Sequence, residues 1–394
     1  MSRRSDSGIT VRRIGRPARA LVAAVAGALG AGAALPASVD AQEIASGVLL
    51  QSYAFDDPAL TGIDRYDVFV VPFAVTVPLG TEWVVSASGA WARGVVTGSG
   101  GGEATLSGPT DTDVRVSWSP RPWLVVRADA TVPTGTSELT LEQGIVAGVS
   151  ASLLLPTAVQ TWGGGSALGA TVAVATQLGA WGVGVAGGYL VSNSFEPLAG
   201  TSIGYDPGNL LHVRVAFDRD VGGTSSFSLV LAAQDFADDQ VLETNLFQVG
   251  TRLQGVARFA FPLASRSSAL VYAGAEYRSE GSVLEELLPG VIDTPSQTLF
   301  NAGASARFPL GRRVALLPSA DLRVLRTGDG LSQGWFGHGG AALDWRVAGN
   351  SAGRSVVLTP SARLMAGSVV VQEGTRSGLF GWEAGLALRV EGGR

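Results

Sequence analysis

The feature that most constrains the fold of this chain is a recurring segment in which apolar and ionisable residues alternate. The clearest example is Trp335–Val347. One face of it carries Trp335, Gly337, Gly339, Ala341, Leu343, Trp345 and Val347, and the other carries Phe336, His338, Gly340, Ala342, Asp344 and Arg346. Successive side chains of a β-strand point to opposite faces, so this pattern predicts a strand that meets a different solvent on each side.

The tryptophans of the apolar face have a spacing that suits a membrane. Trp335 and Trp345 are ten residues apart, which at ~3.3 Å per residue and a tilt near 40° is roughly 25 Å along the membrane normal. Trp83 and Trp91 form a shorter pair, and Trp382 lies on the apolar face of the last alternating segment. We expect these five tryptophans to lie in the aromatic girdles that flank a hydrocarbon band.

Segments of this kind repeat after residue 42, separated by short turns or longer loops. They predict an all-β fold, a transmembrane antiparallel up-and-down β-barrel of about 16 strands, with a count of about 14 to 16 and the register left open. A secreted soluble β-protein is the rival fold, and the tryptophan spacing argues against it. The predicted strands lie near 47–55, 64–77, 82–96, 111–118, 123–132, 167–177, 181–191, 209–219, 225–236, 244–259, 268–279, 297–308, 313–326, 335–347, 355–366 and 378–390.

The connections between these segments divide into two kinds. If the first strand runs outward, the short turns fall on one side of the membrane and the long, often acidic loops on the other, as periplasmic turns and extracellular loops do. The short turns are Pro78–Glu82, Ser119–Pro122, Leu178–Ala180 and Pro309–Arg312. The long loops are 97–110, 133–166, 192–208, 280–296 and 367–377.

Two segments test this count. Residues 167–191 carry no charge, and six glycines with a central Leu178–Ala180 turn favour a hairpin over a membrane helix. In 140–155, Thr140 and Gln143 resemble a capping box and apolar residues recur every four positions, which favours a short helix inside the longest outer loop. A strand there would make the count odd. The loop 133–166 would fold inward and narrow a pore.

Residues 1–41 have the three parts of a secretory signal. An arginine-containing stretch precedes an apolar run from Ala20 to Leu35, and Val39-Asp40-Ala41 supplies small or modest residues before a cleavage point near Ala41. We therefore expect an exported protein of the bacterial outer membrane, with the barrel in 42–394; an uncleaved anchor helix is the alternative. The chain has no cysteine, which excludes disulfides and a lipid-acceptor thiol, so membrane attachment depends on the fold.

The alternate strand positions opposite the apolar face carry arginines, carboxylates and both histidines. One interpretation is a salt-bridged wall that rigidifies the barrel, and another is a polar lumen that favours neutral or anionic solutes. The first four residues of the set lie on adjacent strands and would form one cluster. The predicted lumen-lining residues are Asp113, Arg115, Arg127, Asp129, His212, Arg214, Arg252, Glu276, Arg307, Asp321, Arg323, His338, Asp344, Arg346, Arg363 and Glu383.

One stretch resembles a known family. Asp111–Trp118, a proline-containing turn, Trp123–Val132 and then Pro133-Thr134-Gly135 are similar to the Gram-negative outer-membrane barrels associated with meta-pathway phenol degradation, themselves likened to FadL-type channels. The resemblance implies an outer-membrane channel for hydrophobic compounds. FadL-like channels carry an N-terminal plug, whereas the first strand here begins within a few residues of the predicted cleavage site. Such barrels commonly finish on an aromatic residue, and this sequence finishes on Arg394.

These patterns favour a passive channel or transporter for small molecules, hydrophobic or anionic. The alternative is a non-transporting barrel, either a surface scaffold or adhesin or an outer-membrane hydrolase that uses His212 and His338. We expect no enzyme, because the three Gly-x-Ser-x-Gly matches, at 200–204, 330–334 and 349–353, are expected by chance among 54 glycines.

We expect no catalytic, cofactor or metal site either, since no cluster has metal-ligand spacing. The net charge of −5 argues against nucleic acid as a partner. The expected partners are outer-membrane lipid and lipopolysaccharide, the barrel-assembly machinery and an unidentified small solute.

Overall fold

The computed structural model of the protein describes residues 43–241, 244–264, 266–283, 293–328, 332–349, 355–372 and 375–392. The predicted signal peptide, residues 1–41, lies outside the described residues and stays a prediction.

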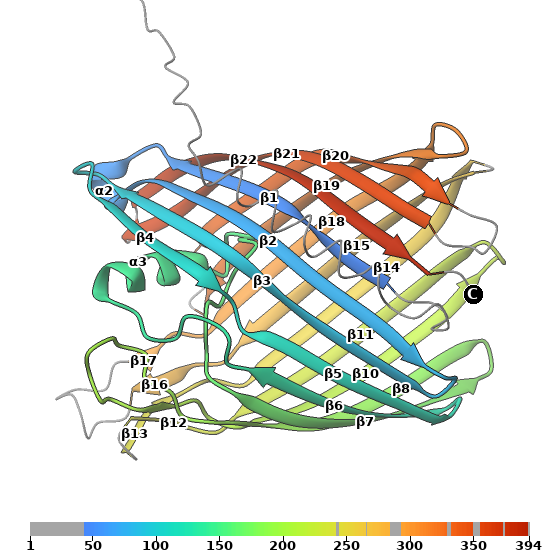
Figure 1. Cartoon of the computed structure of the whole chain (residues 1–394), viewed down its shortest axis with the longest axis horizontal. Helices are drawn as coiled ribbons and strands as arrows, with labels where there is room; N and C mark the ends of the chain where they lie inside the picture. Colours follow the sequence, from blue (N-terminus) through green and yellow to red (C-terminus); the bar gives the residue numbers. More distant parts are fainter. Residues whose placement is uncertain are drawn as a thin grey trace, which may run out of the picture. The chain divides into compact units, whose positions relative to one another are not determined.

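The described residues from 43 onward form a closed antiparallel β-barrel (Figure 1). Consecutive wall strands pair side by side, and the last strand pairs with the first from Glu43↔Glu391 to Phe55↔Leu379, which closes the barrel. In chain order the wall strands are β1 (Glu43–Phe55), β2 (Ile63–Leu79), β3 (Trp83–Gly98), β4 (Glu103–Pro109), β5 (Thr112–Arg121), β6 (Leu124–Val132), β7 (Ala167–Leu178), β8 (Trp181–Ser192), β10 (Leu210–Val221), β11 (Ser225–Phe236), β14 (Arg252–Ala264), β15 (Ser267–Arg278), β18 (Gln297–Pro309), β19 (Val314–Thr327), β20 (Ser332–Gly349), β21 (Ser355–Gln372) and β22 (Thr375–Glu391).

Strands β4 and β5 share one position in the wall, because both pair with β3. Trp91–Thr97 of β3 pairs with β4, and Trp83–Ser88 of the same strand pairs with β5. The 17 strands that the described residues contribute to the main sheet therefore fill 16 positions, and the predicted 16-strand barrel is confirmed. The predicted outer loop 97–110 is wrong, because β4 occupies half of it and continues the wall outward. The Gly108-Pro109 pair resembles a turn in sequence, but the actual turn lies at 99–102, where Gly101 has a φ of +81°.

Two other predicted segments differ from the structure. The predicted strand 244–259 is two strands, since the backbone leaves the wall at 249–251 between β13 (Thr244–Gln248) and β14. The predicted outer loop 367–377 is mostly strand, because β21 extends to Gln372 and β22 starts at Thr375. In these segments the inward side chains are apolar and buried, as Leu106 of β4 and Leu379 of β22 are, so the alternation of polar inward and apolar outward residues that marks a wall strand is lost there.

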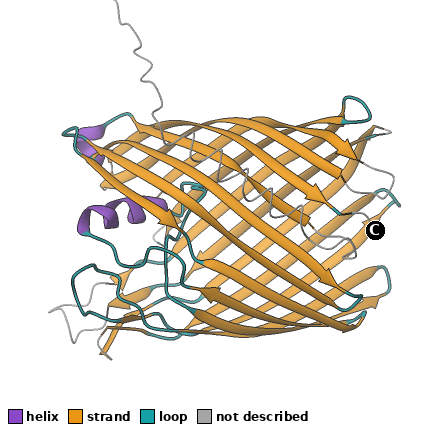
Figure 2. Cartoon of the chain, viewed as in Figure 1, coloured by secondary structure: helices purple, strands orange, loops and turns teal. Residues whose placement is uncertain are grey.

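The long loops on one side carry structure of their own. A separate five-stranded sheet consists of β17 (Asp293–Thr294), β16 (Gly281–Val283), β13, β12 (Asp239–Val241) and β9 (Tyr205–Asp206). Two helices are described, α2 (Pro58–Thr61) and α3 (Leu141–Ser150), both at this end of the barrel (Figure 2). The helix predicted within 140–155 is thus confirmed, with both hydrogen bonds of the capping box between Thr140 and Gln143. The hairpin predicted for 167–191 is also confirmed, as β7 and β8.

None of the described helices is long and apolar enough to cross a membrane.

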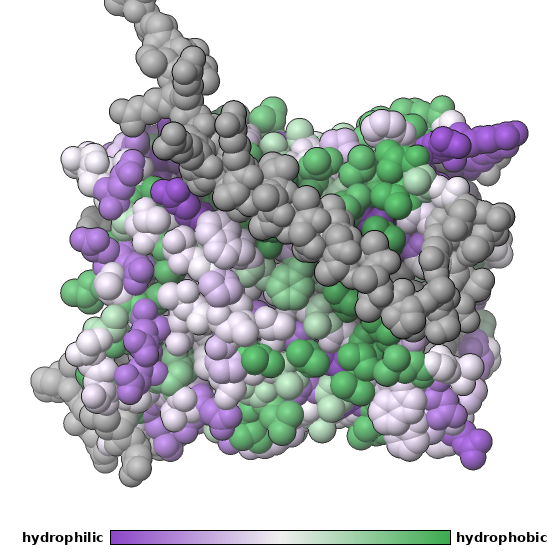
Figure 3. Space-filling model, in the orientation of Figure 1, coloured by the Kyte–Doolittle hydropathy of each residue, from purple (hydrophilic) through white to green (hydrophobic). Residues whose placement is uncertain are grey.

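The outer surface of the barrel is apolar. Figure 3 shows apolar side chains in patches across the visible wall. Exposed outward-facing residues include all five tryptophans predicted for the girdles, Trp83, Trp91, Trp335, Trp345 and Trp382. Trp83 stacks on Trp118 with ring centroids 5.6 Å apart, and Arg219 lies 5.3 Å over the ring of Trp181. Trp118 and Trp181, which are not among the five tryptophans predicted for the girdles, each lie beside a short turn. A closed antiparallel barrel with this exterior is of the outer-membrane type.

Candidate functional site in the barrel lumen

The loop of residues 133–166, here called the inserted loop, folds into the barrel. Its apolar residues Val146, Leu154, Leu155, Val159 and Trp162 are buried in one cluster with inward-facing residues of the wall. Those wall residues are Tyr53, Phe55, Tyr66, Val68, Val70, Ala92, Val96, Leu106, Phe336, Met365 and Leu379. The inward fold that the sequence predicted is therefore present. Its effect on conductance stays a prediction.

A hydrogen-bonded group lies at the centre of this cluster. The hydroxyl of Ser150, at the last position of α3, is fully buried and bonds to the hydroxyl of Tyr66. It accepts from the indole N–H of Trp162 at 3.1 Å and donates to the carbonyl of Val146 at 2.8 Å. Thr157 donates to the carbonyl of Ser150 at 2.6 Å. The polar groups of this packed segment are thus satisfied inside an apolar core, which fixes the loop in one arrangement.

Two wall residues hold the two arms of the inserted loop. Asp111, between β4 and β5, accepts from the backbone N–H of Gly135 at 2.9 Å and from that of Gly164 at 2.7 Å. Gln51 of β1 accepts from the N–H of Ala158 at 2.8 Å. A Cβ at Gly135 would meet the carbonyl oxygen of Trp162 at 2.2 Å, so only glycine fits there. The Pro133-Thr134-Gly135 step therefore has a physical function, which is to bring the chain from β6 across Asp111 into the lumen.

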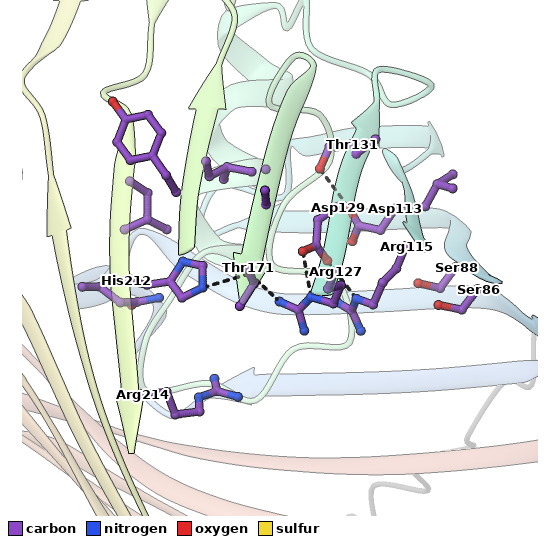
Figure 4. A pocket seen from close by; sticks show the side chains of 18 residues that line it. Ser86, Ser88, Asp113, Arg115, Arg127, Asp129, Thr131, Thr171, His212 and Arg214 are labelled. Carbon is purple, nitrogen blue, oxygen red and sulfur yellow. Dashed lines mark hydrogen bonds and ion pairs between the residues drawn. The ribbon is translucent and has the colours of Figure 1, made fainter. Parts of the chain in front are cut away.

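Beside the inserted loop, one wall of the lumen carries a polar cavity of about 320 Å³, here called the arginine pocket (Figure 4). Asp129 accepts from Nε of Arg115 and from Nε of Arg127, each at 2.8 Å. Both guanidinium groups thus use Nε for the shared carboxylate. A terminal nitrogen of Arg127 also donates to the hydroxyl of Thr171, whereas the terminal nitrogens of Arg115 form no hydrogen bond with a described residue. Thr131 donates to Asp113 at 2.9 Å. The quartet predicted for these adjacent strands is brought together in one pocket.

The opposite side of the arginine pocket is formed by β7, β8 and β10. Thr171 bonds to Nε2 of His212 at 3.3 Å and lies 3.5 Å from a terminal nitrogen of Arg127. Arg214 lies two residues after His212 on the same inward face and lines the pocket. Arg214 forms no salt bridge with any described residue. The pocket therefore holds three guanidinium groups against two carboxylates.

Other predicted lumen residues form separate ion pairs around the wall. Arg363 pairs with Glu383 at 3.1 Å, and Arg252 pairs with Glu276 at 3.1 Å. Asp321 lies 3.5 Å from Arg323 and 3.9 Å from His338, and accepts a hydrogen bond from Tyr272. At the short-turn end, Arg307 donates to Asp344 at 2.8 Å, and exposed Arg346 lies with both around a small cavity. Their contribution to permeation stays a prediction.

The two histidines lie in different clusters. His212 is on β10 and bonds to Thr171, whereas His338 is on β20 beside Asp321. The two histidines therefore do not share one cluster among the described residues. Within those same residues, no group of three or more His, Cys, Asp or Glu side chains has a metal-binding arrangement.

Several residues of the site carry no sequence signal that marks them. Gln51 and Ser150 are ordinary polar residues in sequence, and their roles depend on the inserted loop meeting β1 and β2. The sequence pattern puts Asp111 at the start of a strand, and only its place one strand before Gly135 indicates the contact between them. The pattern puts Trp123 at a strand end, and in the structure it lines an inner cavity.

No protein-family model matches the chain, and no curated protein matches it. Solved structures that match include an outer membrane channel from Pseudomonas putida F1, 14% identical, covering 75% of this chain and 97% of that one, with a TM-score of 0.39. A deletion mutant of the monoaromatic hydrocarbon channel TodX is 9% identical, covers 91% of each chain and has a TM-score of 0.44. The anion-selective porin from Comamonas acidovorans is 12% identical, covers 88% of this chain and 98% of its own, and has a TM-score of 0.40. These include outer-membrane channels of the type named by the sequence resemblance. A likeness at this level concerns the fold and carries no argument about function.

Proposed function

We propose that the protein is a passive channel for small solutes across the outer membrane, narrowed on its extracellular half by the inserted loop. Lipid and lipopolysaccharide would contact its apolar exterior, and the barrel-assembly machinery would insert it after removal of residues 1–41. The observation that carries the proposal is that the loop packs against one part of the inner wall, while the polar arginine pocket lies on another. A barrel whose only purpose was structural would not need an arginine-lined cavity beside a packed loop.

The charges of the inner wall favour anions over cations in this proposal. Arg214 has no carboxylate partner among the described residues, and Asp129 is shared by two arginines. A net positive potential in a narrow, low-dielectric passage raises the local concentration of anions. We therefore expect a channel that conducts anions better than cations.

The test is single-channel conductance of the mature chain, residues 42–394, in planar bilayers. We expect stable conductance steps, a reversal potential shifted toward the anion in a salt gradient, and larger steps after deletion of 137–160. Folding of the deletion variant is checked by heat-modifiable migration. Inserted, heat-modifiable barrel without conductance would overturn the proposal and favour a surface function, and an unchanged conductance in the deletion variant would overturn the constriction.

A further inference from the structure

Two cavities adjoin on the same inner wall. The arginine pocket is one of them. The other, here called the apolar pocket, has a volume of about 190 Å³ and is lined by Trp123, Val125, Ala173, Ala175, Ala186 and Ala216. Arg214 lines both cavities, so they meet at its side chain.

The strand register explains why the polarity changes at this level. Thr171, facing Arg127 across the β6–β7 pair, is followed on the inward face of β7 by Ala173 and Ala175. On β10, Arg214 is followed on the same face by Ala216, which is paired with Gly184 of β8. The inner wall of β6, β7, β8 and β10 is therefore polar toward the inserted loop and has an apolar band below it, which ends at Gln177 and Asp218 near the short turns. Apolar residues facing a water-filled lumen are unexpected unless they contact something apolar.

The polar half has the groups that recognise a carboxylate. Arg115 and Arg127 are held through Nε by Asp129, and Arg127 is held further by Thr171. The terminal nitrogens of Arg115 and one terminal nitrogen of Arg127 have no protein partner among the described residues. Arg214 has no salt bridge with any described residue. It lies apart from the pair of Arg115 and Arg127 in the arginine pocket (Figure 4) and also lines the apolar pocket. Guanidinium groups in fixed positions bind carboxylates with good geometry and charge-assisted hydrogen bonds.

We propose that the two pockets together form one binding site for a small organic carboxylate with an apolar, aromatic body. The carboxylate lies between Arg214 and the terminal nitrogens of Arg115 and Arg127, and the ring lies against Trp123 and the alanines toward the short turns. Aromatic rings pack favourably on a tryptophan face, and the small alanine side chains leave room for one. The site deepens the proposed channel function by naming the solute class, but binding at the site does not depend on conduction.

The test measures binding to the detergent-solubilised mature chain by fluorine NMR, with three matched probes. Para-fluorobenzoate has both the charge and the ring, para-fluorobenzyl alcohol has the ring without the charge, and trifluoroacetate has the charge without the ring. We expect saturable binding of para-fluorobenzoate, and binding of the other two that is weaker by about tenfold or more. Equal binding of the benzoate and the alcohol, or of the benzoate and trifluoroacetate, would overturn the combined site.

Variants locate the site. Arg214→Gln should weaken para-fluorobenzoate binding by about tenfold or more and leave binding of the alcohol unchanged. Trp123→Ala should reduce para-fluorobenzoate to the affinity of trifluoroacetate. The matched controls are Arg258→Gln, which removes a lumen arginine from β14 that lines neither pocket, and Trp345→Ala, which removes a tryptophan from the outer surface.

The outcomes separate the site from the channel. Binding of para-fluorobenzoate that is lost in Arg214→Gln and kept in Arg258→Gln supports the site, even if the barrel does not conduct. Conductance in bilayers without para-fluorobenzoate binding keeps the channel and overturns the site. Equal loss in Arg214→Gln and Arg258→Gln also overturns it, because the effect would then follow the total charge of the lumen.

Discussion

The side-chain amide of Gln51 holds the inserted loop at Ala158. Its oxygen accepts a 2.8 Å hydrogen bond from the N–H of Ala158, and its nitrogen donates to the carbonyl of Pro156 at 3.2 Å. The same nitrogen donates to Glu383 at 2.9 Å, and Gln51 itself is only 4% exposed. Gln51 of β1 therefore fixes the arm of the inserted loop that contains Ala158. Its amide is oriented by Glu383 of β22, the strand that pairs with β1 and closes the barrel.

Replacing Gln51 with alanine should loosen the inserted loop. The change removes the partner of the N–H of Ala158 and of the carbonyl of Pro156, two part-buried hydrogen bonds that contribute about 0.5–1.5 kcal/mol each. We expect larger and noisier single-channel currents than those of the unaltered chain. Gln254→Ala is the matched control, because Gln254 is a lumen amide that bonds to Glu276 away from the loop. Equal noise in both variants would show that Gln51 does not hold the constriction.

Asp111 should control whether the loop stays folded inward. Asp111→Ala removes the acceptor for two backbone N–H groups, those of Gly135 and Gly164, one on each arm. Hydrogen bonds to a charged acceptor contribute about 1.5–3 kcal/mol each. We expect faster hydrogen exchange and proteolysis across 137–160, with unchanged heat-modifiable migration of the barrel. Asp113→Ala, two residues along and bonded to the side chain of Thr131, should leave the loop protected. Loop protection in both variants would contradict this role.

The barrel could be predicted from the sequence because its signal is local. Alternation of the kind seen in Trp335–Val347 records two solvents on the two faces of one strand, so it needs no knowledge of neighbouring strands. The short turn Leu178–Ala180 and the capping box at Thr140 are likewise local, and both elements are present. The prediction was wrong where that signal ends, at β4 and at the loop ends of β21 and β22, where inward residues such as Leu106 and Leu379 are apolar and buried.

The candidate site was less predictable because it depends on non-local contacts. Parity placed Arg115, Arg127 and Asp129 on one face, but the sharing of one carboxylate by two arginines follows from the register across the 121–124 turn. The contact of Gln51 with Ala158 spans more than a hundred positions of the sequence. No pattern within one strand indicates which inward residue meets a loop that returns from another part of the chain.

A side chain introduced at Gly94 in the barrel wall should displace the helix α3. It lies on the inward face of β3, where an added Cβ would be 2.7 Å from Cγ1 of Val146 in α3 and 3.2 Å from the ring of Trp162. Gly94→Val should therefore push α3 from the wall and raise the conductance, as we also expect from deletion of the loop. Gly339→Val is the control, since nothing lies within 4 Å of an added Cβ there. Unchanged protection of α3 against hydrogen exchange in Gly94→Val would contradict the packing.

The separate five-stranded sheet, which contains Tyr205 in β9, should lose stability at alkaline pH when that tyrosine ionises. Burial, and then the hydrogen bond to Asp239, raise the pKa of Tyr205 above its ordinary value. The neutral phenol is thus favoured in the folded sheet. Its contribution to stability is complete below the ordinary tyrosine pKa near 10 and is lost as the pH rises through the raised value.

The tyrosinate absorbance of Tyr205, obtained by subtracting the titration of Tyr205→Phe, measures this shift. We expect the difference to appear at higher pH than for a free tyrosine derivative. In Asp239→Asn the carboxylate no longer repels the ionised phenolate, so the midpoint should move down, while burial should keep it above the ordinary value. Asp239 also accepts from the N–H of Gly208 at 2.8 Å, so hydrogen exchange at 205–208 reports whether the turn stays folded in the variant. A midpoint that is unchanged in Asp239→Asn, with the turn still protected, would show that burial alone sets the titration of Tyr205.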